Sequence, residues 1–161
     1  MTGFSEPAAG GSDGQAYRFL DTLAYVRVPS AATDGQQSVV EMHLRAGHAP
    51  PMHIHEHADE TIHVLDGEVT AHTSSDAHTI TAGQSVVLPS GEPHSLVAES
   101  QAEILTTTSP GGFDEFVVAP SEPADAAVVP TKPPSETAIG RVTESAPAHG
   151  IDIVGPPPGR E

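Results

Sequence analysis

The sequence predicts an all-β fold, an antiparallel sandwich or barrel, over residues 16–117 of the 161-residue chain. Two observations support this fold class. Short runs rich in Val, Ile, Leu and Thr recur along the segment, and turn signals such as Asp34-Gly35, Asp66-Gly67 and Ser90-Gly91 separate them. No part of the segment has the apolar period of an amphipathic helix. Many short strands at this spacing are typical of a sandwich or a barrel.

The apolar runs define the expected strands in chain order. They are 16–20, 23–28, 37–45, 52–55, 60–65, 68–73, 77–81, 85–89, 94–98 and 102–107. We expect the Asp66-Gly67 turn to close a hairpin between 60–65 and 68–73. We expect all helix to follow residue 134.

The segments on either side of the core have different compositions. Residues 1–15 are rich in Gly, Ala and Ser, which predicts a flexible N-terminal arm. Residues 118–161 are interpreted as a Pro-rich linker and a C-terminal docking tail. Within the tail, 135–146 is expected to be a short helix with Ser135 as its N-cap. The run 150–154 is expected to be a strand or a docking segment.

Charge and residue usage exclude several classes of partner and site. The chain has 22 acidic and 6 basic residues, a net charge of −16, which repels nucleic acids and anionic lipids. No apolar run is long enough to cross a bilayer, and the first residues do not resemble a secretory signal. We therefore expect a cytoplasmic protein without nucleic-acid or membrane partners. The absence of cysteine excludes disulfides and thiolate metal sites.

Three histidines and one glutamate form the candidate site. His53 and His55 are two residues apart on an expected strand, so both imidazoles point to the same face. Glu60 begins the next strand, and a Pro-x-Gly turn delivers His94 to the start of another. Three imidazoles and a carboxylate suit one divalent transition-metal ion: Fe, Mn, Ni, Co, Cu or Zn.

A surface cluster of histidines with a salt-bridged glutamate is the alternative interpretation of these residues. Two features favour the metal site instead. Prolines at 50, 51, 89 and 93 bracket the histidines in rigid turns. The residues two and four positions after Glu60 and His94 are apolar, which predicts that the ligands face the interior. They are Ile62, Val64, Leu96 and Ala98. A buried histidine needs a polar partner.

The two blocks that contain these residues resemble the two motifs of the cupin family. The first is Gly47-x5-His53-x-His55-x4-Glu60-x6-Gly67, and the second is Gly83-x5-Pro89-x-Gly91-x2-His94. Ala98 stands where the second motif often has a non-ligating Asn. With the stretches PGGFDEF and GIDIVGPPP, the chain is similar to single-domain, quercetin 2,3-dioxygenase-like cupins. The resemblance implies a double-stranded β-helix, or jelly-roll barrel, with one metal ion on His53, His55, Glu60 and His94.

The resemblance also implies a metal-dependent enzyme. The expected activity is that of a dioxygenase or related oxidoreductase acting on a small aromatic or enol-bearing molecule. Substrate, and dioxygen as a second ligand, would bind at open metal positions, with Glu60 as the base. The expected pocket residues are apolar side chains that should point into the barrel and one loop histidine. They are Met42, Ile62, Val64, Leu88, Leu96 and His57.

Other interpretations stay open at this point. A cyclase, isomerase or lyase of the same fold would use the metal as a Lewis acid only. A cupin that binds a small molecule without turnover would have the same ligands. His57 is either a second base or an exposed loop residue, His63 is expected to face away from the metal, and His48 is expected near the site.

A homodimer is expected because the edge strands of a sheet need a partner. The segments 16–28 and 150–154 are the candidates to cover them.

Overall fold

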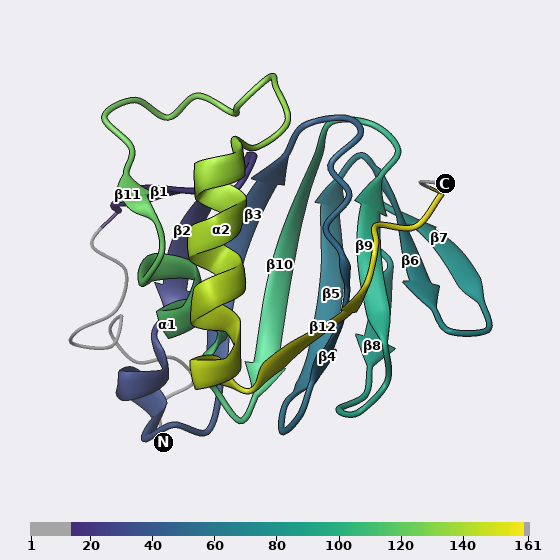
Figure 1. The fold of residues 1–161 in the computed structure, drawn as a ribbon, viewed down its shortest axis with the longest axis horizontal. Coiled ribbons are helices and arrows are strands. Elements are labelled where there is room, and N and C mark those ends of the chain that lie inside the picture. The colour runs from purple at the N-terminus through teal and green to yellow at the C-terminus, as the bar shows by residue number, and fades with distance from the viewer. Residues whose placement is uncertain (1–13, 160–161) are drawn as a thin grey trace, which may run out of the picture.

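Two antiparallel sheets make up most of the chain (Figure 1). The computed structural model describes residues 14–159, so nearly all of the expected arm at 1–15 lies outside the described residues. The larger sheet contains, in spatial order, β11 (Glu122–Pro123), β1 (Ala16–Phe19), β2 (Thr22–Val28), β3 (Ser38–Leu44), β10 (Ala102–Ser109), β5 (Asp59–Asp66) and β8 (Ser85–Leu88). The smaller contains β12 (Ile151–Gly155), β4 (Met52–His55), β9 (His94–Ala98), β6 (Glu68–Thr73) and β7 (Ala77–Thr81).

The predicted all-β class is confirmed, and every expected strand is present within two residues of its expected ends. The alternation of buried and exposed side chains along each run explains why these runs form strands around one core. On β3, every second side chain from Ser38 to Leu44 is buried, and β10 alternates in the same way from Ala102 to Thr108. Apolar side chains of both sheets therefore meet in a shared interior.

The expected hairpin between 60–65 and 68–73 is wrong. β5 pairs with β10 and β8, whereas β6 pairs with β7 and β9, so the Asp66-Gly67 turn carries the chain from one sheet to the other. Gly67 has a φ of 87°, and a Cβ on it would collide with the backbone of Gln101 and Ala102. Glycine is therefore required by the close crossing of two chain segments.

The expectation that all helix follows residue 134 is also wrong. Helix α1 (Phe113–Val118) begins directly after Gly112. Its Phe116 and Val117 are buried, and the Phe116 ring packs edge-on against Phe19 on β1, with ring centroids 5.5 Å apart. Burial of these side chains against the larger sheet stabilises a six-residue helix that is too short to form alone.

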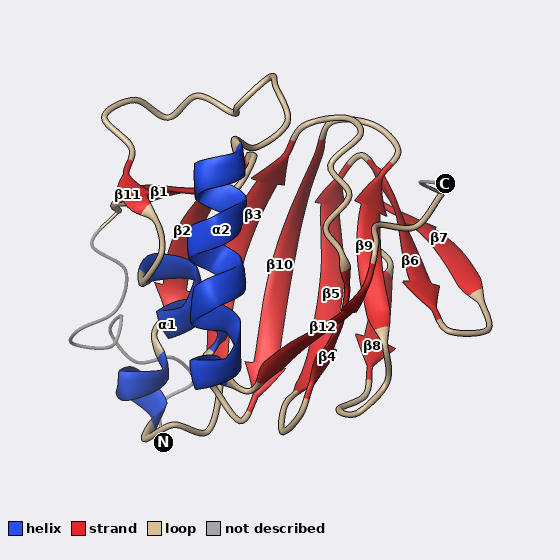
Figure 2. Cartoon of the chain, in the orientation of Figure 1, coloured by secondary structure: helices blue, strands red, loops and turns tan. Residues whose placement is uncertain are grey.

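The expected C-terminal helix and strand are confirmed. Helix α2 (Glu136–Ser145) begins at Ser135, whose side chain accepts a hydrogen bond from the Ala138 amide. Figure 2 shows α1 and α2 on the side of the molecule where β1, β2 and β3 lie. Short 3₁₀ turns form at Ser30–Thr33 and Ala146–His149. None of the α2 side chains is fully buried.

Of the two segments expected to cover sheet edges, β12 lies at the edge of the smaller sheet, whereas β1 and β2 lie inside the larger sheet, between β11 and β3. β12 pairs with β4, and β11 pairs with β1. The homodimer itself stays a prediction. Among residues 14–159, no helix combines the length and apolar character that crossing a membrane requires.

Candidate metal centre

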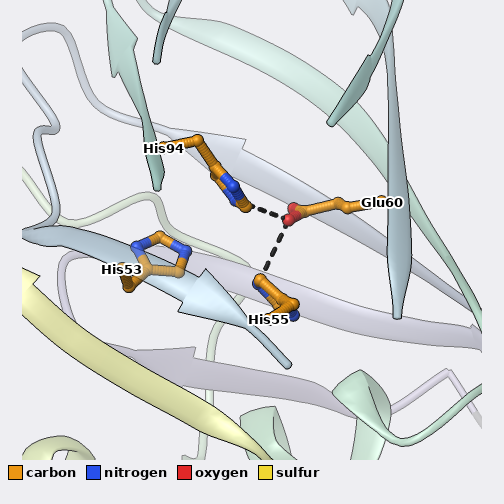
Figure 3. A group of neighbouring side chains, drawn as sticks. All are labelled: His53, His55, Glu60 and His94. Atoms are coloured by element: carbon orange, nitrogen blue, oxygen red, sulfur yellow. Dashed lines mark hydrogen bonds and ion pairs between the residues drawn. The ribbon is translucent and has the colours of Figure 1, made fainter. Parts of the chain in front are cut away.

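Four side chains from three strands converge inside the barrel (Figure 3). His53 and His55 come from β4, Glu60 from β5 and His94 from β9. One potential ligand atom from each residue lies within 4.8 Å of the others. His55, Glu60 and His94 are buried, and His53 is partly exposed. The structure thus brings together all four residues that the sequence analysis selected as ligands.

The carboxylate of Glu60 lies between two of the imidazoles. Its Oε2 atom is 2.9 Å from Nε2 of His94 and 3.1 Å from Nε2 of His55. The His55 and His94 rings are stacked, with centroids 5.3 Å apart and an interplanar angle of 7°. The nitrogen atoms that face Glu60 are therefore the Nε2 atoms of both rings.

Backbone carbonyl groups determine which ring nitrogen of two histidines is free to bind a metal. Nδ1 of His53 donates to the Pro51 carbonyl at 2.8 Å, and Nδ1 of His94 donates to the Glu92 carbonyl at 3.2 Å. A carbonyl oxygen only accepts hydrogen bonds, so the proton of each neutral ring is on Nδ1. The Nε2 lone pairs are then available for a metal ion.

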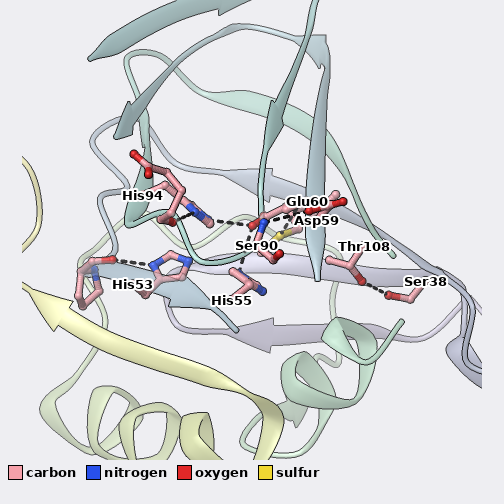
Figure 4. A network of polar contacts seen from close by, with 12 residues as sticks. Ser38, His53, His55, Asp59, Glu60, Ser90, His94 and Thr108 are labelled. Carbon is pink, nitrogen blue, oxygen red and sulfur yellow. Dashed lines mark hydrogen bonds and ion pairs between the residues drawn. The ribbon is translucent and has the colours of Figure 1, made fainter. Parts of the chain in front are cut away.

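The turn before His94 is anchored to neighbouring strands (Figure 4). The Ser90 amide donates to the carboxylate of Asp59, and the Gly91 amide donates to the carbonyl of His55, both at 2.9 Å. His94 is also paired with His53 across β4 and β9. These bonds connect the second sequence block directly to the first and set the position of His94.

Burial and mutual charge shift the pKa values of the site. Burial, assisted by repulsion from His94, lowers the pKa of His53 to about 4, so this ring is neutral at neutral pH. Burial alone would raise the pKa of Glu60, but attraction to the nearby His55 and the hydrogen bond with His94 hold that pKa well below its usual value. Burial opposes protonation of His94, but the carboxylate of Glu60 outweighs it and raises the His94 pKa.

One buried atom shows that these residues fit a metal ion. Nε2 of His55 is buried and has no aligned hydrogen-bond partner among residues 14–159, although Glu60 lies 3.1 Å away. An unsatisfied buried nitrogen is costly, and a coordinated cation would remove that cost. Neutral imidazoles and a carboxylate are the donors that divalent transition metals prefer. The donor set therefore fits one such ion.

A largely apolar cavity adjoins the four residues. His53, Glu60 and His94 form part of its wall, and most of the remaining lining is aliphatic or aromatic. Of the pocket residues expected from the sequence, Met42, Ile62 and Leu96 line this cavity.

The other expected pocket residues lie elsewhere. Val64 and Leu88 are buried in the core and do not line the cavity. The side chain of His57 is 77% exposed beside Glu56 and is also absent from the lining. His63, as expected, faces away from the metal centre, and its Nδ1 lies 2.6 Å from the Ser85 hydroxyl.

Several lining residues were not among the expected pocket residues, and Phe113 and His48 are two of them. Phe113 of α1 lines the cavity with its ring centroid 5.9 Å from that of His55. Its position depends on the short helix that the sequence analysis missed, for which the spacing of Phe113, Phe116 and Val117 was the available signal. His48 also lines the cavity, away from the four clustered residues.

Comparison with known proteins identifies the fold family. Residues 40–108 match the sequence profile described as "Cupin domain". This segment is similar to a cupin domain. This cupin region includes all four clustered residues, and the jelly-roll fold agrees with solved cupin structures.

The comparisons with individual proteins are more distant. The chain is 26% identical over 135 residues to quercetin 2,3-dioxygenase of Bacillus subtilis (strain 168), a match that covers 83% of this chain and 40% of that protein. The chain thus spans well under half of this relative's length. An RmlC-like cupin of Shewanella frigidimarina has a TM-score of 0.56 at 17% identity, over 71% of this chain and 96% of the other. Streptomyces PAC13, solved with uridine, has a TM-score of 0.54 at 17% identity, over 82% and 95%.

Proposed function

We propose that this cupin is a metal-dependent oxidoreductase, specifically a dioxygenase, acting on a small aromatic molecule with an enol or enolisable group. The observation that carries the proposal is the convergence of three imidazoles and a carboxylate on the wall of an apolar cavity. Such a cavity with a few convergent polar groups is the usual form of a small-molecule site. The distant similarity to a quercetin 2,3-dioxygenase supports the substrate class.

The metal ligands in this proposal are His53, His55, Glu60 and His94. Their donor types suit Fe, Mn, Ni, Co or Cu, with Zn as a further candidate. When bound, such an ion would supply Lewis acidity toward a substrate oxygen and, if redox-active, electron transfer to dioxygen. Four protein donors leave room for additional ligands on a five- or six-coordinate ion.

Glu60 is the proposed base. Its low pKa keeps it a carboxylate at neutral pH, so Oε2 is able to accept the proton of a substrate hydroxyl. The hydrogen bond from His94 and the charge of His55 lower the proton affinity of Glu60, whereas burial raises it. A substrate that displaces either histidine contact would therefore make Glu60 a stronger base.

The cavity walls would orient an aromatic substrate and exclude water. Met42, Ile62 and Leu96 offer apolar surface, and the Phe113 ring lies close to His55. An aromatic ligand is able to pack against Phe113 in an edge-on or offset arrangement. Exclusion of water strengthens the electrostatic interactions of a substrate oxygen with the metal centre.

Oxygen consumption tests this function. Metal-loaded protein would be mixed with quercetin in an oxygen electrode, with product formation followed in the same sample. Coupled loss of quercetin and oxygen is the expected result. Conversion without oxygen uptake would replace the dioxygenase with a non-oxidative cyclase, isomerase or lyase. Binding without conversion would indicate a cupin that binds small molecules without turnover.

A further inference from the structure

The cavity extends well beyond the metal centre. Its lining runs from Glu60 and His94 past Ile62 and Met42 to Leu44 and His48. The His48 carbonyl accepts a hydrogen bond from the amide of Ala98, which is at the other end of β9 from His94. Four residues of strand span about 13 Å, so the backbone of His48 lies roughly that far from the backbone of His94.

His48 is held in place by the buried carboxylate of Asp21. Nδ1 of His48 lies 2.5 Å from Oδ1 of Asp21, and Nε of Arg45 lies 2.6 Å from Oδ2 of the same carboxylate. Asp21 is 3% exposed, and His48 is 6% exposed. Although burial acts in the opposite direction, His48 and Arg45 keep the pKa of Asp21 below its usual value, so the carboxylate is charged. Both Asp21 oxygens therefore accept hydrogen bonds.

The contact with Asp21 determines the chemistry that His48 offers to a ligand. A carboxylate only accepts hydrogen bonds, so Nδ1 of His48 must carry a proton. In the neutral ring, Nε2 is then an acceptor. No hydrogen-bond partner for this nitrogen is found in the part of the chain that the structure describes. The His48 residue is 6% exposed and lines the cavity, so an acceptor of this ring without a partner is available to a ligand donor.

We infer that His48 is a second ligand-binding residue, which accepts a hydrogen bond from a hydroxyl group at the far end of the substrate. The ligand class is a molecule with an oxygen function for the metal centre at one end, an apolar aromatic body, and a hydroxyl at the other end. Between the two polar ends the lining is mostly apolar, which suits the aromatic body of such a ligand. Asp21 positions the His48 ring without touching the ligand.

This inference rests on the proposed function, because the probe molecules are chosen from the proposed substrate class. The test measures ligand binding and needs no turnover. The probes are quercetin and unsubstituted flavonol, which share the enol and ketone but differ in their distal hydroxyls. Dissociation constants would be measured anaerobically on nickel-loaded protein. The wild type is expected to bind quercetin about 3- to 10-fold more tightly than flavonol, the range for one hydrogen bond.

Two variants, each of which keeps a polar atom near the position of one His48 ring nitrogen, separate the ligand contact of His48 from a structural role. His48→Asn keeps a donor for Asp21 but has no atom at the position of Nε2, so it should lose the preference for quercetin and retain flavonol binding. His48→Gln places an amide near the position of Nε2, so it should keep part of the preference. His43→Asn is the matched control, because His43 also contacts a carboxylate, that of Glu41, but does not line the cavity.

Several results would overturn the inference. They are an unchanged preference in His48→Asn, the absence of a preference in the wild type, an equal loss in His43→Asn, or no binding of either probe. Failure of the proposed function gives a different result, because the preference for quercetin would still depend on His48 but no oxygen would be consumed. Melting curves of all variants would show that each is folded at the temperature of the binding assay.

Discussion

Glu60 and His94 meet from opposite sheets: Oε2 of Glu60 on β5 lies 2.9 Å from Nε2 of His94 on β9. A metal ion held by these residues would link the two halves of the barrel. Because an ion that binds only the folded state stabilises it by mass action, metal should add about 2.7 kcal/mol to the unfolding free energy at one hundred times its Kd. Calorimetry of the protein with and without a chelator would detect the shift, and identical melting temperatures would contradict it.

Replacement of Glu60 separates its proposed role as a metal ligand from its proposed role as the base. Glu60→Gln keeps the size of the side chain and a weak oxygen donor but removes the charge and the basicity. Turnover should fall by roughly two to four orders of magnitude, the usual range for a lost general base, while the three histidines still bind metal more weakly. Assays at saturating metal, with occupancy measured on the same samples, would test this.

The control for this variant is Glu41→Gln. Glu41 also contacts a histidine, His43, but the pair lies outside the cavity, so its replacement should leave turnover unchanged. A fully metal-loaded Glu60→Gln protein with near-normal turnover would show that Glu60 is not the base.

Metal affinity should depend on pH through His94 in particular. The pKa of His94 is raised above 6.5 by Glu60, so a proton must leave this ring before the ion binds. The pKa of His53 is about 4, so that ring is already neutral over the same range. Below the His94 pKa, binding should therefore release about one proton per ion, and the affinity should weaken about tenfold per pH unit.

Calorimetric titration of metal in buffers with different ionisation enthalpies counts these protons. The affinity should rise with pH and level off once His94 is deprotonated. Binding whose affinity and proton release do not change with pH would mean that Glu60 does not hold a proton on His94.

The sequence revealed the four clustered residues because each lies in a short block with its own turn. His53-x-His55 is a strand pattern, and the Pro-x-Gly turn before His94 is local, so their geometry follows from residues close in the chain. Ile62 and Leu96 are apolar and lie two residues beyond Glu60 and His94, which indicated that the ligands face the interior, and both are buried in the structure.

Features that depend on distant contacts were not predictable in this way. A turn at Asp66-Gly67 is visible in the sequence, but whether it joins neighbouring strands or crosses between sheets depends on β10 and β9, about 30 residues later. Helix α1 is stabilised by packing against Phe19, not by its own sequence. The contact of His48 with Asp21 spans 27 positions and leaves no local pattern.

Asp21 should contribute strongly to stability. Asp21→Asn removes a buried charge that both His48 and Arg45 contact, and this should cost about 2 to 4 kcal/mol at neutral pH. A carboxyl group with a lower pKa in the folded state stabilises the fold above its unfolded pKa, near 3.8, and that contribution is lost as pH falls through the folded pKa.

The difference between wild type and Asp21→Asn should therefore shrink in acid. Urea unfolding at neutral pH and below pH 3.8 would measure it. The exposed Asp152 provides the control, since Asp152→Asn should change stability little at either pH. An Asp21→Asn penalty that is small at neutral pH would contradict the role given to this ion pair.

The metal content of histidine variants tests the central claim most directly. The wild type, loaded with nickel and freed of excess by gel filtration, should contain about one ion per chain by elemental analysis. His53→Ala, His55→Ala and His94→Ala each remove one of four converging donors, so each should retain only a small fraction of the metal. His63→Ala, which alters a partly buried histidine on β5 that contacts Ser85, should retain it all. Full metal content in a folded His53, His55 or His94 variant would contradict the four-residue metal centre.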